Sequence, residues 1–158
     1  MRIQRIIVAG MAGFLIFTSG SAALAGKTIE EVGAFACVTD KWDEKELEKD
    51  HKIADAVFRC VGVPDDTAAP KYTEDCIAKY EYMPDKSWKS KGTCTRNYKG
   101  GDQVFDSFEE GSHLKDYTYT TTGGTGKYQG ATGTGTYLYE NITDSLGGTR
   151  FKGKLILP

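Results

Sequence analysis

The sequence lacks the motifs that identify common hydrolases and metal enzymes. It contains no G-x-S-x-G nucleophile elbow and no H-E-x-x-H pair of histidines. Of its two histidines, His51 lies in a highly charged stretch and His113 follows a Gly-Ser break, where solvated side chains are expected. No motif therefore marks a catalytic residue, and we expect neither a metal nor another cofactor.

The sequence also lacks an excess of positive charge. It has 20 Lys and Arg residues against 22 Asp and Glu residues, and two of the arginines, Arg2 and Arg5, precede residue 26. The remainder of the chain therefore carries 18 basic and 22 acidic residues, a balance near −4. Nucleic-acid-binding domains are usually strongly basic, so we expect no nucleic-acid partner.

Long hydrophobic runs are confined to the first 25 residues. Arg2 and Arg5 precede an apolar stretch from Ile6 to Phe17, and small residues lead to Ala23-Leu24-Ala25. This order predicts a signal peptide, residues 1–25, cleaved after Ala25, with an uncleaved anchor as the alternative. The apolar stretch is shorter than the roughly 20 residues of a membrane-spanning helix. We therefore expect residues 26–158 to form one exported domain, periplasmic or extracellular, with no stable membrane insertion after cleavage.

Short apolar segments separated by turns dominate the rest of the chain. Residues 33–39 and 54–63 are strand-like and flank the charged segment 40–52, which we expect to be a solvated loop or a short helix. Further on, Pro84–Ser87 predicts a turn between two more strands. In the last segment Phe151, Leu155 and Leu157 share one face.

Turns and strands continue in this way to the end of the chain, without a long helical pattern. Seven to nine antiparallel strands predict an all-β domain. We expect a small antiparallel β-barrel of about eight strands, because closure removes the exposed sheet edges, and a β-sandwich is the alternative.

The four cysteines, Cys37, Cys60, Cys76 and Cys94, are expected to form two disulfides in an oxidising compartment. A four-thiolate metal site is disfavoured, because no close Cys-x-x-Cys knuckle is present. Four cysteines allow three pairings. Folding about the charged segment 40–52 favours a bond between Cys37 and Cys60, and folding about the turn Pro84–Ser87 favours one between Cys76 and Cys94. A bond between Cys60 and Cys76 is the competing arrangement.

A glycine-rich run, TTTGGTGKYQGATGTGTYLYE from residue 120 to residue 140, raises the question of a phosphate-binding loop. A Walker A loop needs Ser or Thr after Gly-Lys, but Tyr128 follows Lys127. A Rossmann fingerprint needs a third glycine where Gln129 stands. We interpret the glycines as turns and bends of a small barrel, with residues 127–129 as a short strand piece and Lys127 in solvent.

Within this run, Thr122 to Gly133, TGGTGKYQGATG, resembles the turn-and-strand signature of the allene oxide cyclase-like and dirigent-like barrel superfamily. It is also similar to a group of small exported bacterial proteins of unknown function. The resemblance implies an eight-stranded antiparallel barrel with an internal cavity. Plant members cyclise a fatty-acid epoxide or orient phenoxy radicals with cavity residues outside this motif, and none of those residues aligns with this chain.

Four tyrosines are candidate cavity residues: Tyr117 and Tyr119 share one strand face, and Tyr137 and Tyr139 share another. Alternation also places Glu109 and Glu110 on opposite faces, and Glu110 is the fifth candidate cavity residue. A metal site made of Glu109, Glu110, His113 and Asp116 is the less favoured reading of that segment, because the Gly111-Ser112 break predicts a solvated turn.

The sequence supports three functions. The favoured one is a non-catalytic binder of a small apolar or phenolic ligand, which leaves an enzyme disfavoured. A cofactor-free cyclase or isomerase of the allene oxide cyclase or dirigent type is the second, and a structural or interaction protein with a filled barrel is the third. The oligomeric state is left open.

Overall fold

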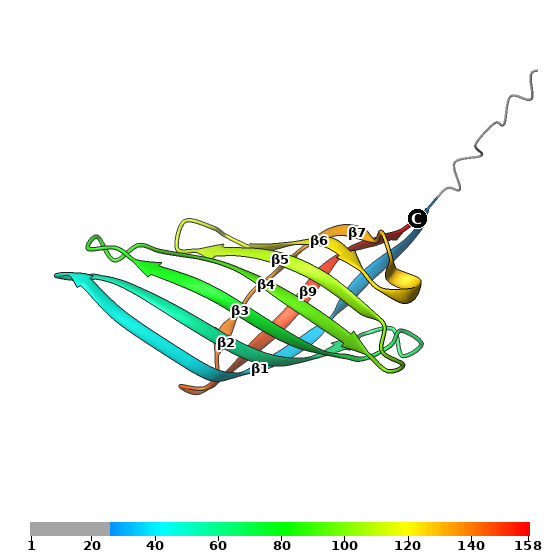
Figure 1. Ribbon diagram of the computed structural model, residues 1–158, viewed down its shortest axis with the longest axis horizontal. Coiled ribbons are helices and arrows are strands. Elements are labelled where there is room, and N and C mark those ends of the chain that lie inside the picture. Colours follow the sequence, from blue (N-terminus) through cyan, green and yellow to red (C-terminus); the bar gives the residue numbers. More distant parts are fainter. Residues whose placement is uncertain (1–25) are drawn as a thin grey trace, which may run out of the picture.

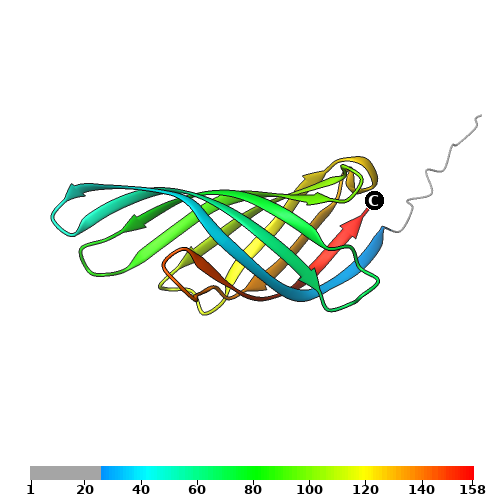
Figure 2. The ribbon, with the colours of Figure 1, turned by 90° about the horizontal axis from the view of Figure 1, so that it is seen from below.

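The chain folds into a closed ring of eight antiparallel strands (Figures 1 and 2). The computed structural model describes residues 26–158, so the predicted signal peptide, residues 1–25, lies outside the described residues. The strands are β1 (Lys27–Glu48), β2 (His51–Pro64), β3 (Tyr72–Tyr82), β4 (Trp88–Tyr98), β5 (Gln103–Gly111), β6 (Tyr117–Gly124), β7 (Thr132–Tyr137), β8 (Glu140–Asn141) and β9 (Leu146–Leu157).

Each strand pairs with its neighbour in the chain, except that β7 pairs with β9 and the short β8 lies beside β9. The ring closes because β1 pairs with β2 on one side and with β9 on the other. The predicted all-β fold of about eight antiparallel strands is confirmed. No helix within residues 26–158 is long and apolar enough to cross a membrane.

The ring has two distinct ends. The turns between β1 and β2, between β3 and β4 and between β5 and β6 lie at one end, which we call the hairpin end (Figure 1, left). The start of β1, the end of β9 and the turn between β2 and β3 lie at the other, which we call the terminal end. A 3-10 helix, η1 (Gly126–Tyr128), also lies at the terminal end.

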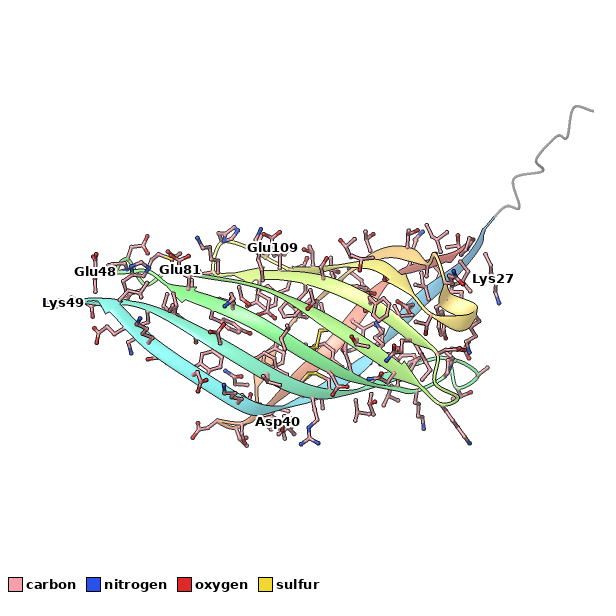
Figure 3. All side chains as sticks on the ribbon, in the orientation of Figure 1. Lys27, Asp40, Glu48, Lys49, Glu81 and Glu109 are labelled. Carbon is pink, nitrogen blue, oxygen red and sulfur yellow. A yellow bond between two sulfur atoms is a disulfide. The ribbon has the colours of Figure 1, made fainter. Side chains whose placement is uncertain are left out.

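The charged segment 40–52 is part of a long hairpin, so the predicted loop or short helix is wrong. β1 runs through almost all of it, and β2 begins after a two-residue turn. The charges are compatible with strands because they pair across the hairpin, as where Lys52 Nζ lies 2.7 Å from Glu44 Oε1. Trp42 lies on the same face of β1 as Glu44, and its ring lies 4.9 Å from that of Tyr80. Figure 3 shows this hairpin projecting at the hairpin end.

Both disulfides join directly opposed residues of neighbouring strands. Cys37 on β1 is bonded to Cys60 on β2, and Cys76 on β3 is bonded to Cys94 on β4. This is the pairing that the hairpins favour. The four side chains point into the ring, where the sulfur–sulfur bonds are visible in Figure 3. Two disulfides suggest an oxidising environment for the folded chain.

We expect reduction of the two disulfides to destabilise the fold. The bonds close loops of 23 and 18 residues. Loss of either should lower the free energy of unfolding by about 3 kcal/mol, because the reduced unfolded chain gains conformational entropy. Urea unfolding with and without a thiol reductant measures the change. A native mass equal to that of the all-thiol chain, and not four hydrogens lighter, would contradict the two bonds.

The glycine-rich run leaves β6 and forms η1 (Gly126–Tyr128) at the terminal end. Residues 127–129 are not a strand piece, as the sequence predicted, because η1 turns the chain there and buries the Tyr128 side chain. Gly126 permits this turn: its φ is 56°, and a Cβ atom there would lie 1.9 Å from an Asp102 carboxylate oxygen. Lys127 stays largely exposed, with Nζ 5.0 Å from the centre of the Tyr128 ring.

The later glycines of the run make room for an aromatic ring. Gly135 on β7 lies opposite Gly153 on β9, and the ring of Tyr119 on β6 lies across both. A Cβ atom at Gly135 would come within 2.3 Å of this ring, and one at Gly153 within 2.2 Å of its hydroxyl oxygen. These two glycines are therefore required by a close approach and not by a bend.

A methyl group at Gly135 should displace Tyr119. We expect Gly135→Ala to lower the free energy of unfolding by about 1–3 kcal/mol, because overfilling a closely packed interior forces side chains from their preferred positions. Thr134→Ala is the matched control, since Thr134 is the neighbouring residue and faces solvent. Chemical denaturation of both variants gives the comparison. Equal stability of Gly135→Ala and Thr134→Ala would show that the packing of the Tyr119 ring does not require glycine at residue 135.

Candidate functional site

The interior of the ring contains a cavity of about 90 Å³ between the two ends. Its wall combines aromatic rings, both disulfides and a small number of charged side chains. The aromatic lining consists of Phe35, Phe58, Tyr72, Tyr80, Phe108, Tyr119, Tyr137, Tyr139 and Phe151. A mostly apolar cavity with a few convergent polar groups is the usual form of a small-molecule site.

Alternation along the strands brings the polar lining residues inside. β4 directs Cys94 and Arg96 into the ring, two residues apart. β5 directs Asp106 and Glu110 into it in the same way. Each ionisable residue is thus in phase with buried neighbours of its own strand, and the closed sheet prevents it from turning outward.

Arg96 is the only basic side chain that the described part of the chain contributes to the lining, and three carboxylates surround it. The residue is 3% exposed. Its Nη1 lies 2.9 and 3.0 Å from the two carboxylate oxygens of Glu31, and its Nε lies 2.6 Å from Asp106 Oδ2. Glu74 is more distant, at 3.8 Å from Nε. The cluster therefore contains more acids than one guanidinium can neutralise.

Aromatic rings and hydroxyl groups complete this charged cluster. The guanidinium carbon of Arg96 lies 5.4 Å from the centre of the Tyr72 ring and 5.2 Å from that of Tyr119. The Tyr119 hydroxyl donates to Glu31 at 3.3 Å, and the Thr121 hydroxyl donates to Asp106 at 2.7 Å. The rings shield the ion pairs from solvent while the hydroxyls stabilise the carboxylates.

Burial changes the acidity of the cluster. Desolvation raises the pKa of Glu74 to about 7, although the charge of Arg96 opposes the shift. Desolvation also raises the pKa of Asp106, against the same opposing charge. Burial alone would lower the pKa of Arg96, but the carboxylates of Asp106 and Glu31 outweigh it and raise that pKa above its ordinary value. The cluster therefore holds a carboxyl group that exchanges its proton near neutral pH.

Glu110 forms a second polar group, nearer the hairpin end. Its residue is 7% exposed, and it has no cationic partner among residues 26–158. The hydroxyl of Tyr80 donates to it at 3.1 Å and that of Tyr137 at 2.9 Å. Desolvation raises the pKa of Glu110, while these two hydrogen bonds act in the opposite direction. This carboxyl is held in the wall of the cavity by hydroxyl groups alone.

Comparison with known proteins identifies the fold. No protein-family model and no curated protein sequence matches the chain. Among solved structures, the pterocarpan synthase dirigent protein GePTS1 is similar, with a TM-score of 0.55, 10% identity and coverage of 98% of this chain and 97% of that chain. The chain has a dirigent-like fold. The pterocarpan synthase dirigent protein PsPTS1 is also similar, with a TM-score of 0.53, 8% identity and coverage of 83% of this chain and 96% of that chain.

The dirigent-like barrel brings four of the five predicted cavity residues together. Tyr119, Tyr137, Tyr139 and Glu110 all line the cavity. Tyr117 does not, although it faces the same side of β6 as Tyr119. It lies nearer the hairpin end, where other rings cover it: Trp88 lies 5.9 Å and Tyr137 5.7 Å away between ring centres.

The disfavoured metal site of Glu109, Glu110, His113 and Asp116 is not formed. Glu109 points outward, where its carboxylate lies 2.6 Å from Lys91 Nζ, so the predicted separation of Glu109 from Glu110 is confirmed. Within residues 26–158, the only clustered group of potential ligands is Cys60, Glu74 and Cys76, and both of its sulfurs are consumed in disulfides.

The cluster around Arg96 was not predicted from the sequence. The alternation of strand side chains could have indicated this cluster. Arg96 lies two residues after Cys94, and Glu74 lies two residues before Cys76, so each shares a strand face with a cysteine. Once the cysteines are expected inside, these charged residues must be inside as well. Glu31 and Asp106 are in phase with apolar residues of their own strands in the same way.

The raised pKa of Glu74 makes stability depend on pH. The folded state holds this proton more tightly than the unfolded state, so the stability present below about pH 4.5 is lost as pH rises toward 7. We expect the free energy of unfolding to fall by up to about 3 kcal/mol over this range, and the fall to be smaller in Glu74→Gln.

Asp75→Asn provides the matched control, because Asp75 is the neighbouring residue on β3 and lies on its opposite face, where its carboxylate accepts a hydrogen bond from Asn97. Urea unfolding between pH 4 and pH 8 measures all three proteins. An identical pH dependence in the wild type and in Glu74→Gln would contradict the assignment to Glu74.

Proposed function

We propose that the protein is a non-catalytic binding protein whose barrel cavity takes a small apolar or phenolic ligand in an exported compartment. The observation that carries the proposal is the buried Glu110 carboxyl in the wall of an aromatic cavity. A carboxylate accepts about four hydrogen bonds, and the hydroxyls of Tyr80 and Tyr137 supply two. A ligand hydroxyl can therefore donate to Glu110 without displacing either tyrosine.

The remaining wall suits the apolar part of such a ligand. Phe35, Phe58 and Phe108 line the cavity together with both disulfides, and these groups offer no competing hydrogen bonds. The volume of about 90 Å³ restricts the ligand to the size of about one ring. A phenol combines the two properties, since its ring packs against the aromatic wall and its hydroxyl is a donor to a carboxylate.

A cofactor-free cyclase or isomerase is the second candidate, and the cluster around Arg96 favours it. Glu74, with a pKa near 7, is suited to accept or donate a proton at neutral pH, and Arg96 is placed to stabilise a developing negative charge. The dirigent proteins that share the fold are named pterocarpan synthases. At 8–10% identity this name supports only an analogy for the present chain.

Replacement of Glu110 tests the binding function. We expect phenol to bind the wild type, and Glu110→Gln to weaken binding about tenfold or more, because a hydrogen bond to a charged group is lost. Glu109→Gln is the matched control, since it makes the same change on the outward face and should leave affinity unchanged. Isothermal titration calorimetry measures all three, and circular dichroism checks the folds.

Benzene provides a further control, because it fills the same space without a hydroxyl and should bind both proteins equally. No measurable phenol binding to the wild type would favour a filled barrel with a structural role. Equal phenol affinity in Glu110→Gln and Glu109→Gln would remove Glu110 from the site. Conversion of a bound molecule, lost in Glu74→Gln, would favour the cyclase or isomerase.

A further inference from the structure

A second cavity lies at the terminal end of the barrel. Its volume is about 220 Å³, which exceeds that of the first cavity. It is bounded by the start of β1, the connection between β2 and β3, and the side chains of Tyr98 and Tyr128. Tyr72 and Phe151 line both cavities and therefore form part of the wall between them.

The lining of this second cavity is acidic and aromatic. Among residues 26–158, it is lined by four carboxylates, Glu30, Glu31, Asp65 and Asp66, and by no lysine, arginine or histidine. Three of these carboxylates are paired with cations beside the cavity, namely Lys154, Arg96 and Arg150. Asp66 has no cationic partner among the residues that the structure describes, which leaves one negative charge at the cavity.

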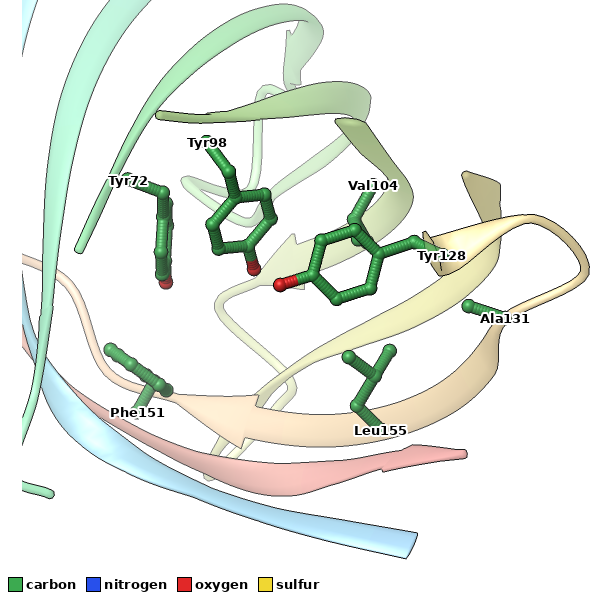
Figure 4. Close-up of a cluster of buried hydrophobic side chains, with 7 residues drawn as sticks. All are labelled: Tyr72, Tyr98, Val104, Tyr128, Ala131, Phe151 and Leu155. Atoms are coloured by element: carbon green, nitrogen blue, oxygen red, sulfur yellow. The ribbon is translucent and has the colours of Figure 1, made fainter. Parts of the chain in front are cut away.

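The hydroxyls of two largely buried tyrosines give an independent indication of a ligand. Tyr72 is 8% exposed and Tyr128 is 4% exposed, and neither hydroxyl has a hydrogen-bond partner within residues 26–158. Figure 4 shows the Tyr128 hydroxyl pointing toward that of Tyr98 in the middle of the cluster, and the Tyr72 hydroxyl pointing toward Phe151. Both side chains line the cavity, so their hydroxyl oxygens are available to hydrogen-bond a polar group of a bound molecule.

The same rings already attract cations from other directions. Lys127 Nζ lies 5.0 Å from the centre of the Tyr128 ring and 6.0 Å from that of Tyr98. The guanidinium of Arg96 lies over Tyr72. Aromatic rings that face a negatively charged cavity favour a cation there over a neutral or anionic group.

We infer that the second cavity binds a protonated primary amine with a small apolar body. The ammonium group has three N–H donors, and the cavity offers acceptors in the hydroxyl oxygens of Tyr72 and Tyr128 and in the carboxylates. Apolar side chains, including Ile29, Val32 and Leu155, surround the rest of the ligand. This site is separate from the phenol site and does not depend on Glu110.

The test uses 2-phenylethylamine as the probe and 2-phenylethanol as its uncharged match, with isothermal titration calorimetry at pH 7. We expect the amine to bind at least about tenfold more tightly than the alcohol, because only the amine carries a charge. Tyr128→Phe keeps the ring and removes the hydroxyl, and it should weaken amine binding about tenfold. Asp66→Asn changes an exposed residue and should weaken the amine while leaving the alcohol unchanged.

Glu110→Gln is the control for location, because Glu110 lines only the first cavity, and it should leave amine affinity unchanged. Amine binding that is lost in Glu110→Gln and retained in Tyr128→Phe would overturn the inference by placing the amine in the first cavity. Equal affinity for amine and alcohol, or no binding of the amine, would also overturn it. None of these results bears on the binding of phenol, which is measured separately.

Discussion

The backbone pairing of β1 with β9 is the interaction on which the rest of the structure depends. It joins Lys27 through Val38 to the antiparallel Leu146 through Leu157 and converts an open sheet into a ring. Without it, two strand edges would be exposed and the interior would be open to water. With it, alternation along each strand separates the inside from the outside, and each inward residue must find its partners among other inward residues.

This constraint explains how the interior accommodates its acids. Of the residues from Gly26 to Pro158, four with carboxyl groups lie inside, together with the guanidinium of Arg96: Glu31, Glu74, Asp106 and Glu110. Arg96 forms close ion pairs with Glu31 and Asp106, while Glu110 accepts hydrogen bonds from tyrosine hydroxyls. Buried ion pairs are weak evidence for stability, because desolvation offsets their attraction.

Much of the fold, but less of the site, could be predicted from the sequence. The turn at Pro84–Ser87 and the alternation in β9 are local patterns, so both were predictable. The extent of the first hairpin was not, because segment 40–52 has the composition of a loop, and its strand pairing depends on cross-strand charges and on a contact between Trp42 and Tyr80. The signature in the glycine-rich run indicated the dirigent-like fold for reasons of backbone geometry, not of ligand chemistry.

Some features of the site could likewise be predicted from the sequence, and others could not. Alternation predicts that Glu109 and Glu110 lie on opposite faces and that the tyrosines of one strand share a face, but it does not say which face points inward. Arg96 was missed, because an arginine in a strand is ordinarily placed on the solvent side, and only closure of the ring makes the phase with Cys94 decisive. Tyr128 was missed because its burial results from the turn of η1, which the glycines permit but do not specify.

The two disulfides fasten the ring unevenly. Both lie within β1 to β4, so half of the barrel is joined by covalent bonds, while β5 to β9 are held only by hydrogen bonds and packing. Partial opening of a protein begins where its structure is least stable. The half of the barrel from β5 to β9 is therefore expected to open before the half from β1 to β4, and hydrogen exchange should be faster along its strands.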